Sequence, residues 1–360
     1  MTRIGIVGTG NISGIYLENA AKLGYEVLAV SDLDLERAQA QATQYGVPHA
    51  LSVDDLLAHP DIEIVLNLTI PAAHGPIALR SLEAGKHVYN EKPLASTLEE
   101  AKKMLERAAQ KGLRVGCAPD TFLGAGFQIA REQLEGGIIG QPVHASALMA
   151  SVGPEGWHPD PSFFFQPGAG PLFDMGPYYL TALISLFGSV SSVFATVKST
   201  HTERTVGSGP KAGQSVPVNT PTHVSGVLNF ESGLSASLTM SFDMVPGSAP
   251  LLEVYGTKGS LTLPDPNTFG GPLETHSVTG EKIELSLNKP FGDNSRGLGL
   301  ADMAQAIQEG RPHLASGQLA YHVLETMFKL LESGEAGKLM TLESKVVRPE
   351  ALGEIAARVG

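Results

Sequence analysis

The sequence has few of the features that mark secreted, membrane-spanning or disulfide-stabilised proteins. Cys117 is the only cysteine in 360 residues, so no disulfide can form within the chain and a reducing compartment is permitted. The least charged stretch, 178–197, is interrupted by Gly188 and several serines, and it predicts a helix followed by a strand rather than a membrane span. The first apolar run, 3–8, is too short for a signal peptide. We therefore expect a cytoplasmic protein that makes no membrane contact.

Positive charge is also scarce. The chain has 25 Lys and Arg residues against 37 Asp and Glu residues, and its net charge is -12. An acidic surface repels phosphate backbones, which argues against nucleic acid as a partner. The 11 histidines show no tight ligand spacing, so no metal is expected. The composition, 42% hydrophobic and 17% charged, is that of a globular protein, and the length favours two domains.

Strand-like and helix-like segments alternate over the first 118 residues. Several of the strand-like runs are continuously apolar, as expected for strands that are covered on both faces. Short links between alternating elements predict an α/β domain with a doubly wound parallel sheet. The predicted strands are 4–7, 25–31, 62–69, 87–90 and 113–117.

The pattern changes after about residue 120. From Leu234 to Phe242, apolar residues alternate with serine and threonine, which is typical of a strand with one buried face. The residues 231–233 join this strand to the preceding run as a hairpin. We therefore expect a first domain over 1–120 and, over 121–360, an α+β domain with an open, mainly antiparallel sheet. The segments 201–221 and 264–280 are predicted loops.

A glycine loop follows the first predicted strand and precedes a helix. Gly8 permits a tight turn, and Gly10 lets the backbone approach a pyrophosphate at the positive end of that helix. Asp32 ends the second strand, where a carboxylate accepts hydrogen bonds from ribose hydroxyls and repels a 2′-phosphate. The nearest following cation, Arg37, lies on the next helix and does not adjoin Asp32. This arrangement indicates a Rossmann domain that binds NAD rather than NADP.

Two further motifs carry candidate catalytic groups. Lys92, between Glu91 and Pro93, follows the fourth strand, and its ammonium could stabilise charge that develops on a substrate oxygen. Asp174 and Tyr178 lie four residues apart after a glycine-rich segment, so both can face the same side of a helix. The alternatives are a solvated surface lysine, a helix-capping aspartate and a core tyrosine.

Together these residues resemble the Gfo/Idh/MocA family of oxidoreductases over nearly the whole chain. The shared motifs are 8–12, 69–71 with His74, 84–88, 91–95, 168–178 and 301–302. The resemblance implies a Rossmann domain followed by an open-sheet domain, and often a homodimer or homotetramer built on that sheet. The cofactor-binding residues that the resemblance and the glycine loop imply are Gly8, Gly10, Asn11, Ile12, Asp32, Thr69, Pro71, His74, Glu91 and Lys92.

One motif departs from the pattern that many family members show. Where they have Asp-x-Gly-x-His-x-x-Asp, this chain has Tyr178 at the histidine position and Thr181 at the last aspartate. A histidine base is therefore unsupported, and Tyr178 is the candidate base, with Lys92 assisting it. Asp174 would orient the substrate or share the proton, and it is the alternative base.

The predicted sugar pocket lies around a loop that precedes the glycine-rich segment. Trp157, the only tryptophan, offers a face for the C–H surface of a sugar, although it could instead pack under a long loop. Hydroxyl groups would be bound by polar neighbours. The candidate substrate-binding residues are Asp120, Trp157, His158, Asp160, Gln166, Asp174 and Arg296.

The sequence therefore predicts an enzyme that oxidises a secondary hydroxyl of a sugar, glycoside or polyol with NAD. One alternative is a glycosidase of the same fold that oxidises, eliminates and reduces its substrate again, with no net redox change. A second alternative is a non-catalytic dinucleotide or sugar sensor. The presence of Lys92, Asp174 and Tyr178 together argues against the sensor.

Overall fold

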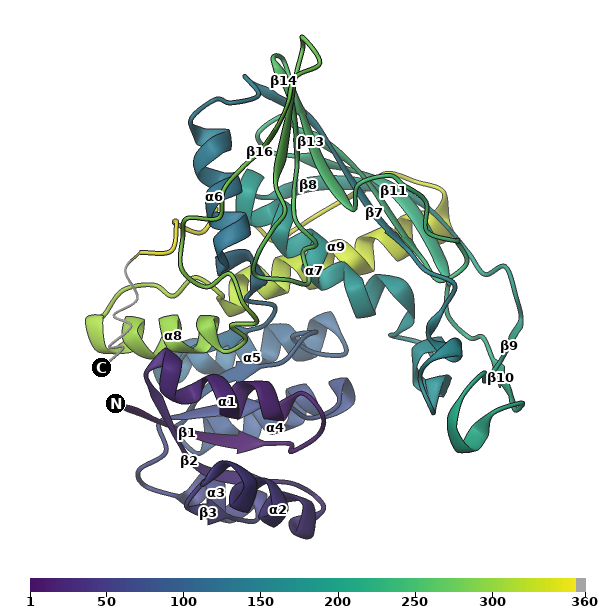
Figure 1. Ribbon diagram of the computed structural model, residues 1–360. Helices are drawn as coiled ribbons and strands as arrows, with labels where there is room; N and C mark the ends of the chain where they lie inside the picture. Colours follow the sequence, from purple (N-terminus) through teal and green to yellow (C-terminus); the bar gives the residue numbers. More distant parts are fainter. Residues whose placement is uncertain (354–360) are drawn as a thin grey trace. The chain divides into compact units, whose positions relative to one another are not determined.

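A computed structural model describes residues 1–353 and divides the chain into two compact units (Figure 1). Unit 1 comprises Met1–Gly124, Asp293–Tyr321 and the described residues from Pro349 onward, and unit 2 comprises Ala125–Gly292 and His322–Arg348. The predicted division at residue 120 lies close to the first boundary, but it had assigned 293–321 to the second domain. That segment is held in unit 1 by contacts between residues far apart in the sequence, such as the bridge between Gly116 and Ser316.

The sheet of unit 1 has six parallel strands in the order β3-β2-β1-β4-β5-β6. The order reverses between β1 and β4, and at such a point the carboxyl ends of the strands leave a crevice for a ligand. The strands are β1 (Thr2–Val7), β2 (Tyr25–Ser31), β3 (His49–Ala50), β4 (Ile64–Asn67), β5 (His87–Asn90) and β6 (Val115–Cys117). The predicted doubly wound parallel sheet is thus confirmed.

The helices of unit 1 begin and end where the local sequence favours it. Asp34, Ser52 and Thr97 each accept a backbone N–H at a helix N-terminus, and Gly46 and Gly112 end two helices in the left-handed conformation. The helices are α1 (Ser13–Leu23), α2 (Leu35–Tyr45), α3 (Val53–Ala58), α4 (Pro71–Glu83), α5 (Leu98–Lys111) and α8 (Leu298–Glu309), with a short 3-10 turn η1 (Thr121–Leu123).

Unit 2 contains a nine-stranded sheet in the order β16-β15-β14-β13-β7-β12-β11-β8-β17. Neighbours are antiparallel except for β12 and β7, which run parallel. The strands are β7 (Pro142–Ala150), β8 (Val190–Lys198), β11 (His223–Phe230), β12 (Ser235–Ser241), β13 (Leu252–Gly256), β14 (Gly259–Thr262), β15 (Glu274–Ser277), β16 (Lys282–Glu284) and β17 (Met340–Thr341). The open, mainly antiparallel sheet was predicted correctly.

Both segments predicted as loops contain short strands. A separate hairpin within 201–221 pairs β9 (Glu203–Thr205) with β10 (Ser215–Pro217), and β15 lies within 264–280. Each strand has only three or four residues, too few for an alternating pattern to be visible in the sequence. The remaining elements of unit 2 are α6 (Ala125–Glu135), α7 (Gly170–Phe187), most of α9 (Gly317–Ala336), and the 3-10 turns η2 (Pro154–Gly156), η3 (Pro161–Phe165) and η4 (Gly209–Lys211).

Two long helices cover one face of the nine-stranded sheet. Figure 1 shows α7 and α9 side by side beneath β7, β8 and β11, and the Phe173 and Phe328 rings meet edge to face at 5.0 Å between the two helices. Along β12 the apolar side chains Ala236, Leu238 and Met240 are buried. Within residues 1–353, the structure contains no helix with the length and apolarity that a membrane span requires.

Candidate active site

The glycine loop of unit 1 joins β1 to α1 at the crevice. Gly8 has a φ of 100°, and a Cβ at this position would lie 2.7 Å from the Leu68 backbone, so only glycine fits. A Cβ on Gly10 would meet no atom of the described residues within 4 Å, which leaves room on that side of the loop. Ser13 begins α1 and donates its hydroxyl to the Gly10 carbonyl at 2.7 Å. The loop and the start of α1 therefore form the kind of site where a pyrophosphate binds.

Asp32 directly follows β2, and protein donors occupy both of its carboxylate oxygens. Oδ2 accepts from the Thr9 N–H at 2.7 Å and from the Thr9 hydroxyl at 2.9 Å. Oδ1 accepts from the Asp34 N–H at 3.0 Å and from Arg37 Nη2 at 2.5 Å. Burial alone would raise the pKa of Asp32, but the hydrogen bonds from Arg37, Thr9 and Asp34 outweigh it and hold the pKa at about 2.

The contact with Arg37 corrects the expectation that no cation adjoins Asp32. The long arginine side chain reaches back from the first turn of α2 to the end of β2, a contact that sequence spacing does not reveal. Asp32 remains ionised at neutral pH, as a residue that accepts hydrogen bonds from ribose hydroxyls should.

Exposed apolar side chains surround the same edge of the sheet. Leu33 after β2 is 101% exposed, Ile70 after β4 is 71% exposed and Ile12 in the glycine loop is 36% exposed. Asn11 beside Ile12 is also exposed. Large aliphatic groups left in water on three neighbouring loops are unusual for a monomer surface and suit the flat apolar faces of a dinucleotide.

Lys92 lies in the turn 91–94 that directly follows β5. The Glu91 carboxylate accepts from the Tyr16 hydroxyl of α1 at 2.7 Å with Oε1, and from the Lys92 N–H at 2.8 Å with Oε2. Glu91 therefore links the helix that follows the glycine loop to the backbone of Lys92. The peptide bond between Lys92 and Pro93 is cis.

The predicted cofactor residues between β4 and α4 have different roles in unit 1. Pro71 is the first residue of α4, where its missing N–H costs nothing. Thr69 donates its hydroxyl to Asn67 Oδ1 at 2.7 Å. His74 is 1% exposed, and its two ring nitrogens lie 2.6 Å from the Pro93 carbonyl and 3.0 Å from the Thr69 carbonyl. The ring of His74 thus supports the backbone around the site.

Asp120 and Arg296, two predicted substrate residues, lie beside the start of α8. Asp120 is 1% exposed, and its Oδ2 accepts from the N–H groups of Gly297 and Gly299, both at 2.9 Å. Burial and the nearby Glu91 charge raise the pKa of Asp120 to about 6, against the lowering effect of these hydrogen bonds. Arg296 donates to Asn294 Oδ1 at 2.7 Å. Within unit 1, Asp120 therefore secures the N-terminus of α8.

Asp174 and Tyr178 lie one turn apart near the start of α7 in unit 2. Gly170 begins this helix with a φ of 81°, and a Cβ there would lie 2.7 Å from the Pro221 carbonyl oxygen. Asp174 is partly exposed, whereas Tyr178 is 8% exposed. The spacing puts both groups on one face of the helix, as the sequence indicated.

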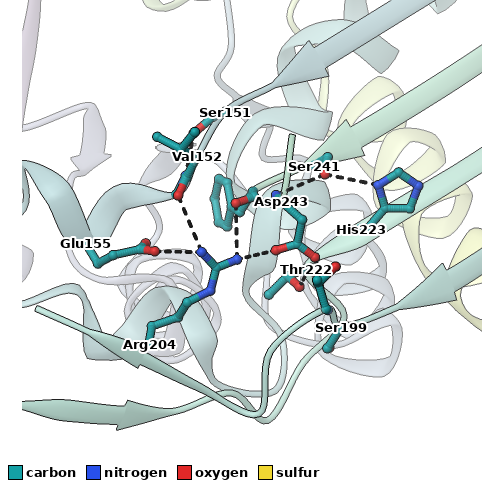
Figure 2. Close-up of polar contacts among 12 residues, drawn as sticks. Ser151, Val152, Glu155, Ser199, Arg204, Thr222, His223, Ser241 and Asp243 are labelled. Atoms are coloured by element: carbon teal, nitrogen blue, oxygen red, sulfur yellow. Dashed lines mark hydrogen bonds and ion pairs between the residues drawn. The ribbon is translucent and has the colours of Figure 1, made fainter. Parts of the chain in front are cut away.

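An arginine with a largely buried side chain holds the segment before the loop 156–160, here called the Trp157 loop. Figure 2 shows Arg204, from β9, between Glu155 and Asp243. Its guanidinium donates to Glu155 Oε1 at 2.7 Å, to the Phe242 carbonyl at 3.2 Å and to the Asp243 carboxylate. The Arg204 side chain is 10% exposed and that of Asp243 is 4% exposed. This ion-pair network fixes η2, and with it the start of the loop, to β9 and the end of β12.

The predicted sugar-binding residues of this loop differ in how they are used. Trp157 is 67% exposed, and its ring meets that of His158 at 5.4 Å. Asp160 pairs with Lys211 at 2.6 Å, and this ion pair lowers the pKa of Asp160. Gln166 accepts from Asn219 Nδ2 at 3.0 Å. Trp157 thus presents an open aromatic face, while Asp160 and Gln166 have partners within unit 2.

The candidate residues fall into two groups, one in each unit. The unit 1 group comprises Gly8, Gly10, Asn11, Ile12, Asp32, Thr69, Pro71, His74, Glu91, Lys92, Asp120 and Arg296, and the unit 2 group comprises Trp157, His158, Asp160, Gln166, Asp174 and Tyr178. That Lys92 and Tyr178 act on one substrate stays a prediction. Among residues 1–353, no group of three His, Cys, Asp or Glu side chains could hold a metal ion.

Sequence reasoning missed several supporting residues. Thr9 and Arg37 bind Asp32, Asn67 and Asn90 support the turn 91–94, and Arg204 anchors the Trp157 loop. A polar Asn67 in an otherwise apolar strand, and Asn90 at the end of another, were the visible signals.

Residues 2–118 match the oxidoreductase family with an NAD-binding Rossmann fold named Gfo/Idh/MocA, and residues 127–262 match a C-terminal domain of the same family. The chain is 28% identical to 1,5-anhydro-D-fructose reductase of Ensifer adhaerens over 72% of its own length and 75% of the relative. It is 27% identical to D-glucoside 3-dehydrogenase of Escherichia coli K12 over 94% of its own length and 97% of the relative.

A solved structure has a similar fold over almost the whole chain. Levoglucosan dehydrogenase in complex with NADH and levoglucosan gives a TM-score of 0.80 at 21% identity, with 95% of this chain and 99% of the other covered. At that identity the likeness establishes the fold.

Proposed function

The chain belongs to the Gfo/Idh/MocA family of oxidoreductases with an NAD-binding Rossmann domain, and from that premise we propose that it oxidises a secondary hydroxyl of a sugar, glycoside or polyol. The observation that carries the proposal is the link through Glu91. Its carboxylate joins α1, the helix of the dinucleotide loop, to the Lys92 N–H. This link fixes the backbone of Lys92 beside the dinucleotide loop, which supports a role for its ammonium at the edge of the sheet where the cofactor of a Rossmann domain binds.

Bound NAD supplies the hydride acceptor for this reaction. The residues of the chain must remove the hydroxyl proton at the same time, which requires a positioned base. Tyr178 accepts that proton. A phenol with a pKa of about 10 is a poor base at neutral pH, so the Lys92 ammonium assists by favouring the phenolate form. Asp174, one turn from Tyr178, orients the substrate hydroxyl or shares the proton.

The substrate class is supported by the relatives and by the Trp157 loop. The compounds for which three relatives are named, anhydrofructose, glucosides and levoglucosan, each have a ring with several hydroxyl groups. Trp157 offers an exposed indole face of the kind that stacks on the C–H surface of such a ring. His158, packed against Trp157, accepts from the Asp160 N–H with Nδ1 at 3.1 Å and offers Nε2 to a hydroxyl group.

A screen of sugars, cyclitols and glycosides for NADH formation, followed at 340 nm in absorbance, tests the proposal. The expected result is NADH formation with at least one substrate, together with a keto product. A redox-neutral glycosidase would release a free sugar without net NADH, and a sensor would bind ligand without turnover. Either of these results contradicts the proposal.

Assembly and location are further parts of the proposal. The face of the nine-stranded sheet opposite α7 and α9 exposes Phe194, Val227 and Tyr255. This face supports a homodimer or homotetramer, since an isolated protein would leave the three apolar groups in water. A cytoplasmic location agrees with the single, buried Cys117.

A further inference from the structure

Three buried polar side chains lie next to the turn 91–94, two at the carboxyl ends of β4 and β5 and one in α4. Asn67 is the last residue of β4 and Asn90 the last of β5, and the two face each other in the parallel register. His74 lies in the first turns of α4. Their exposed fractions are 0%, 0% and 1%. Polar groups so far from water are costly unless hydrogen bonds satisfy them.

Hydrogen bonds join the two asparagines to each other and to the segments on either side. Asn67 Nδ2 donates to Asn90 Oδ1 at 3.0 Å and to the His74 carbonyl at 3.1 Å. Asn67 Oδ1 accepts from the Thr69 hydroxyl at 2.7 Å and from the Thr69 N–H at 3.3 Å. Each polar atom of the Asn67 amide therefore has a partner, and one of those partners is Asn90.

The same network holds the turn 91–94 at two successive carbonyls. Asn90 Nδ2 donates to the Leu94 carbonyl at 2.9 Å. His74 Nδ1 lies 2.6 Å from the Pro93 carbonyl, and donates to it in the tautomer that carries the proton there. The backbone that carries Lys92 is therefore tied to the end of β4 and to α4 by buried groups.

We propose that Asn67, His74 and Asn90 are positioning residues for Lys92, and that they fix its ammonium by clamping the turn 91–94 through the Pro93 and Leu94 carbonyls. This inference rests on the proposed catalytic function of Lys92. An apolar cluster could fill the same volume, but it could not fix the direction of the two carbonyls. Asn90 and the His74 ring supply that directional constraint at the two carbonyls, and Asn67 holds Asn90 in place.

The clamp is tested by Asn90→Val, which keeps the volume and the strand preference but removes the bonds to Leu94 and Asn67. Turnover should fall about tenfold to a hundredfold, the scale expected when a reacting group is displaced by about 1 Å. The dissociation constant for NAD should stay close to wild type, whereas the melting temperature should fall by a few degrees, because Asn67 Nδ2 loses an acceptor and the Leu94 carbonyl loses a donor. Ser81→Ala, which removes another buried polar side chain of unit 1, is the matched control and should leave turnover unchanged.

The decisive readout is the effect of Asn90→Val in a Lys92→Ala background. If Asn90 acts through Lys92, Asn90→Val adds little to the loss of turnover that Lys92→Ala already causes. A full further loss, or normal turnover of Asn90→Val while Lys92→Ala is impaired, overturns the clamp and leaves the proposed function intact. Near-normal turnover of Lys92→Ala instead contradicts the catalytic role proposed for Lys92, on which the clamp rests.

A second measurement does not depend on activity or on one variant. Asn90→Ser, with a shorter side chain, serves if Asn90→Val does not fold. Amide hydrogen exchange of the segment 91–94 should be at least several-fold faster in either variant than in wild type, with the segment 64–67 unchanged. Unaltered exchange in 91–94 overturns the proposed clamp.

Discussion

Replacing Asp120 with asparagine should change how the stability of the protein depends on pH. Burial raises the pKa of this carboxyl from 3.8 to about 6 in the folded state. Between these two values the unfolded chain ionises while the folded chain stays protonated, so wild-type stability falls as pH rises through this window. A difference of about two pKa units corresponds to about 3 kcal/mol, which is lost in full only above the folded pKa. Asparagine keeps an oxygen that can accept from Gly297 and Gly299 but carries no charge.

Urea unfolding at pH 4 and at pH 7.5 measures the effect, because other titrating groups cancel in the difference between variant and wild type. The free energy of unfolding of Asp120→Asn should rise by about 2–3 kcal/mol relative to wild type between the two pH values. Asp32→Asn is the control, since hydrogen bonds from Arg37 and Thr9 outweigh burial and hold the pKa of Asp32 at about 2. A lowered pKa changes stability mainly below about pH 4, so the gap between Asp32→Asn and wild type should stay nearly constant between these two pH values. A constant gap between Asp120→Asn and wild type would refute the argument that this carboxylate is buried at a cost.

Three further predictions concern the cofactor, the loop anchor and the assembly. Asp32→Ala should narrow the preference for NAD over NADP, mainly by relieving repulsion of the 2′-phosphate. Calorimetric titration checks this, and tighter binding of NADP than of NAD to the wild-type protein would contradict the predicted preference for NAD. Arg204→Ala leaves the carboxylates of Glu155 and Asp243 without their cation, so the free energy of unfolding should fall by roughly 3–5 kcal/mol, with the NAD affinity unchanged. An unchanged melting temperature would show that these ion pairs contribute nothing to stability. Light scattering at micromolar concentration should give the mass of a dimer or tetramer for the wild-type protein and a smaller mass for Phe194→Glu. A monomer mass for the wild-type protein would reject the proposed assembly.

The elements of unit 1 could be predicted because each depends on local sequence. The strand 25–31 has the predicted bounds, and so does 87–90. The capping side chains of Ser52 and Thr97 mark helix starts through bonds only three residues long. Periodicity and capping chemistry act within a few residues, and a single sequence displays both.

The contacts that the sequence did not reveal join residues that are far apart in the chain or linked by long side chains. Asn67 and Asn90 are separated by 23 positions and meet only because β4 and β5 are neighbours. The bonds that Gly297 and Gly299 donate to Asp120 help to hold 293–321 in unit 1, although more than 170 positions separate them in the chain. Such contacts form only in the packed fold, whereas a motif can be identified from residues that are neighbours in the sequence.

In the proposed reaction, Lys92 and Tyr178 together remove the hydroxyl proton during oxidation. The measurement is steady-state turnover of Lys92→Ala and Tyr178→Phe on the substrate that the screen identifies, combined with NAD titration of each variant. Each variant should turn over about a hundredfold more slowly or worse, the usual scale for a general acid–base group, with NAD affinity within about twofold of wild type. If Tyr178→Phe stays active while Asp174→Asn is inactive, the base is Asp174. If both Lys92→Ala and Tyr178→Phe keep near-normal turnover, the proposed catalytic site is wrong.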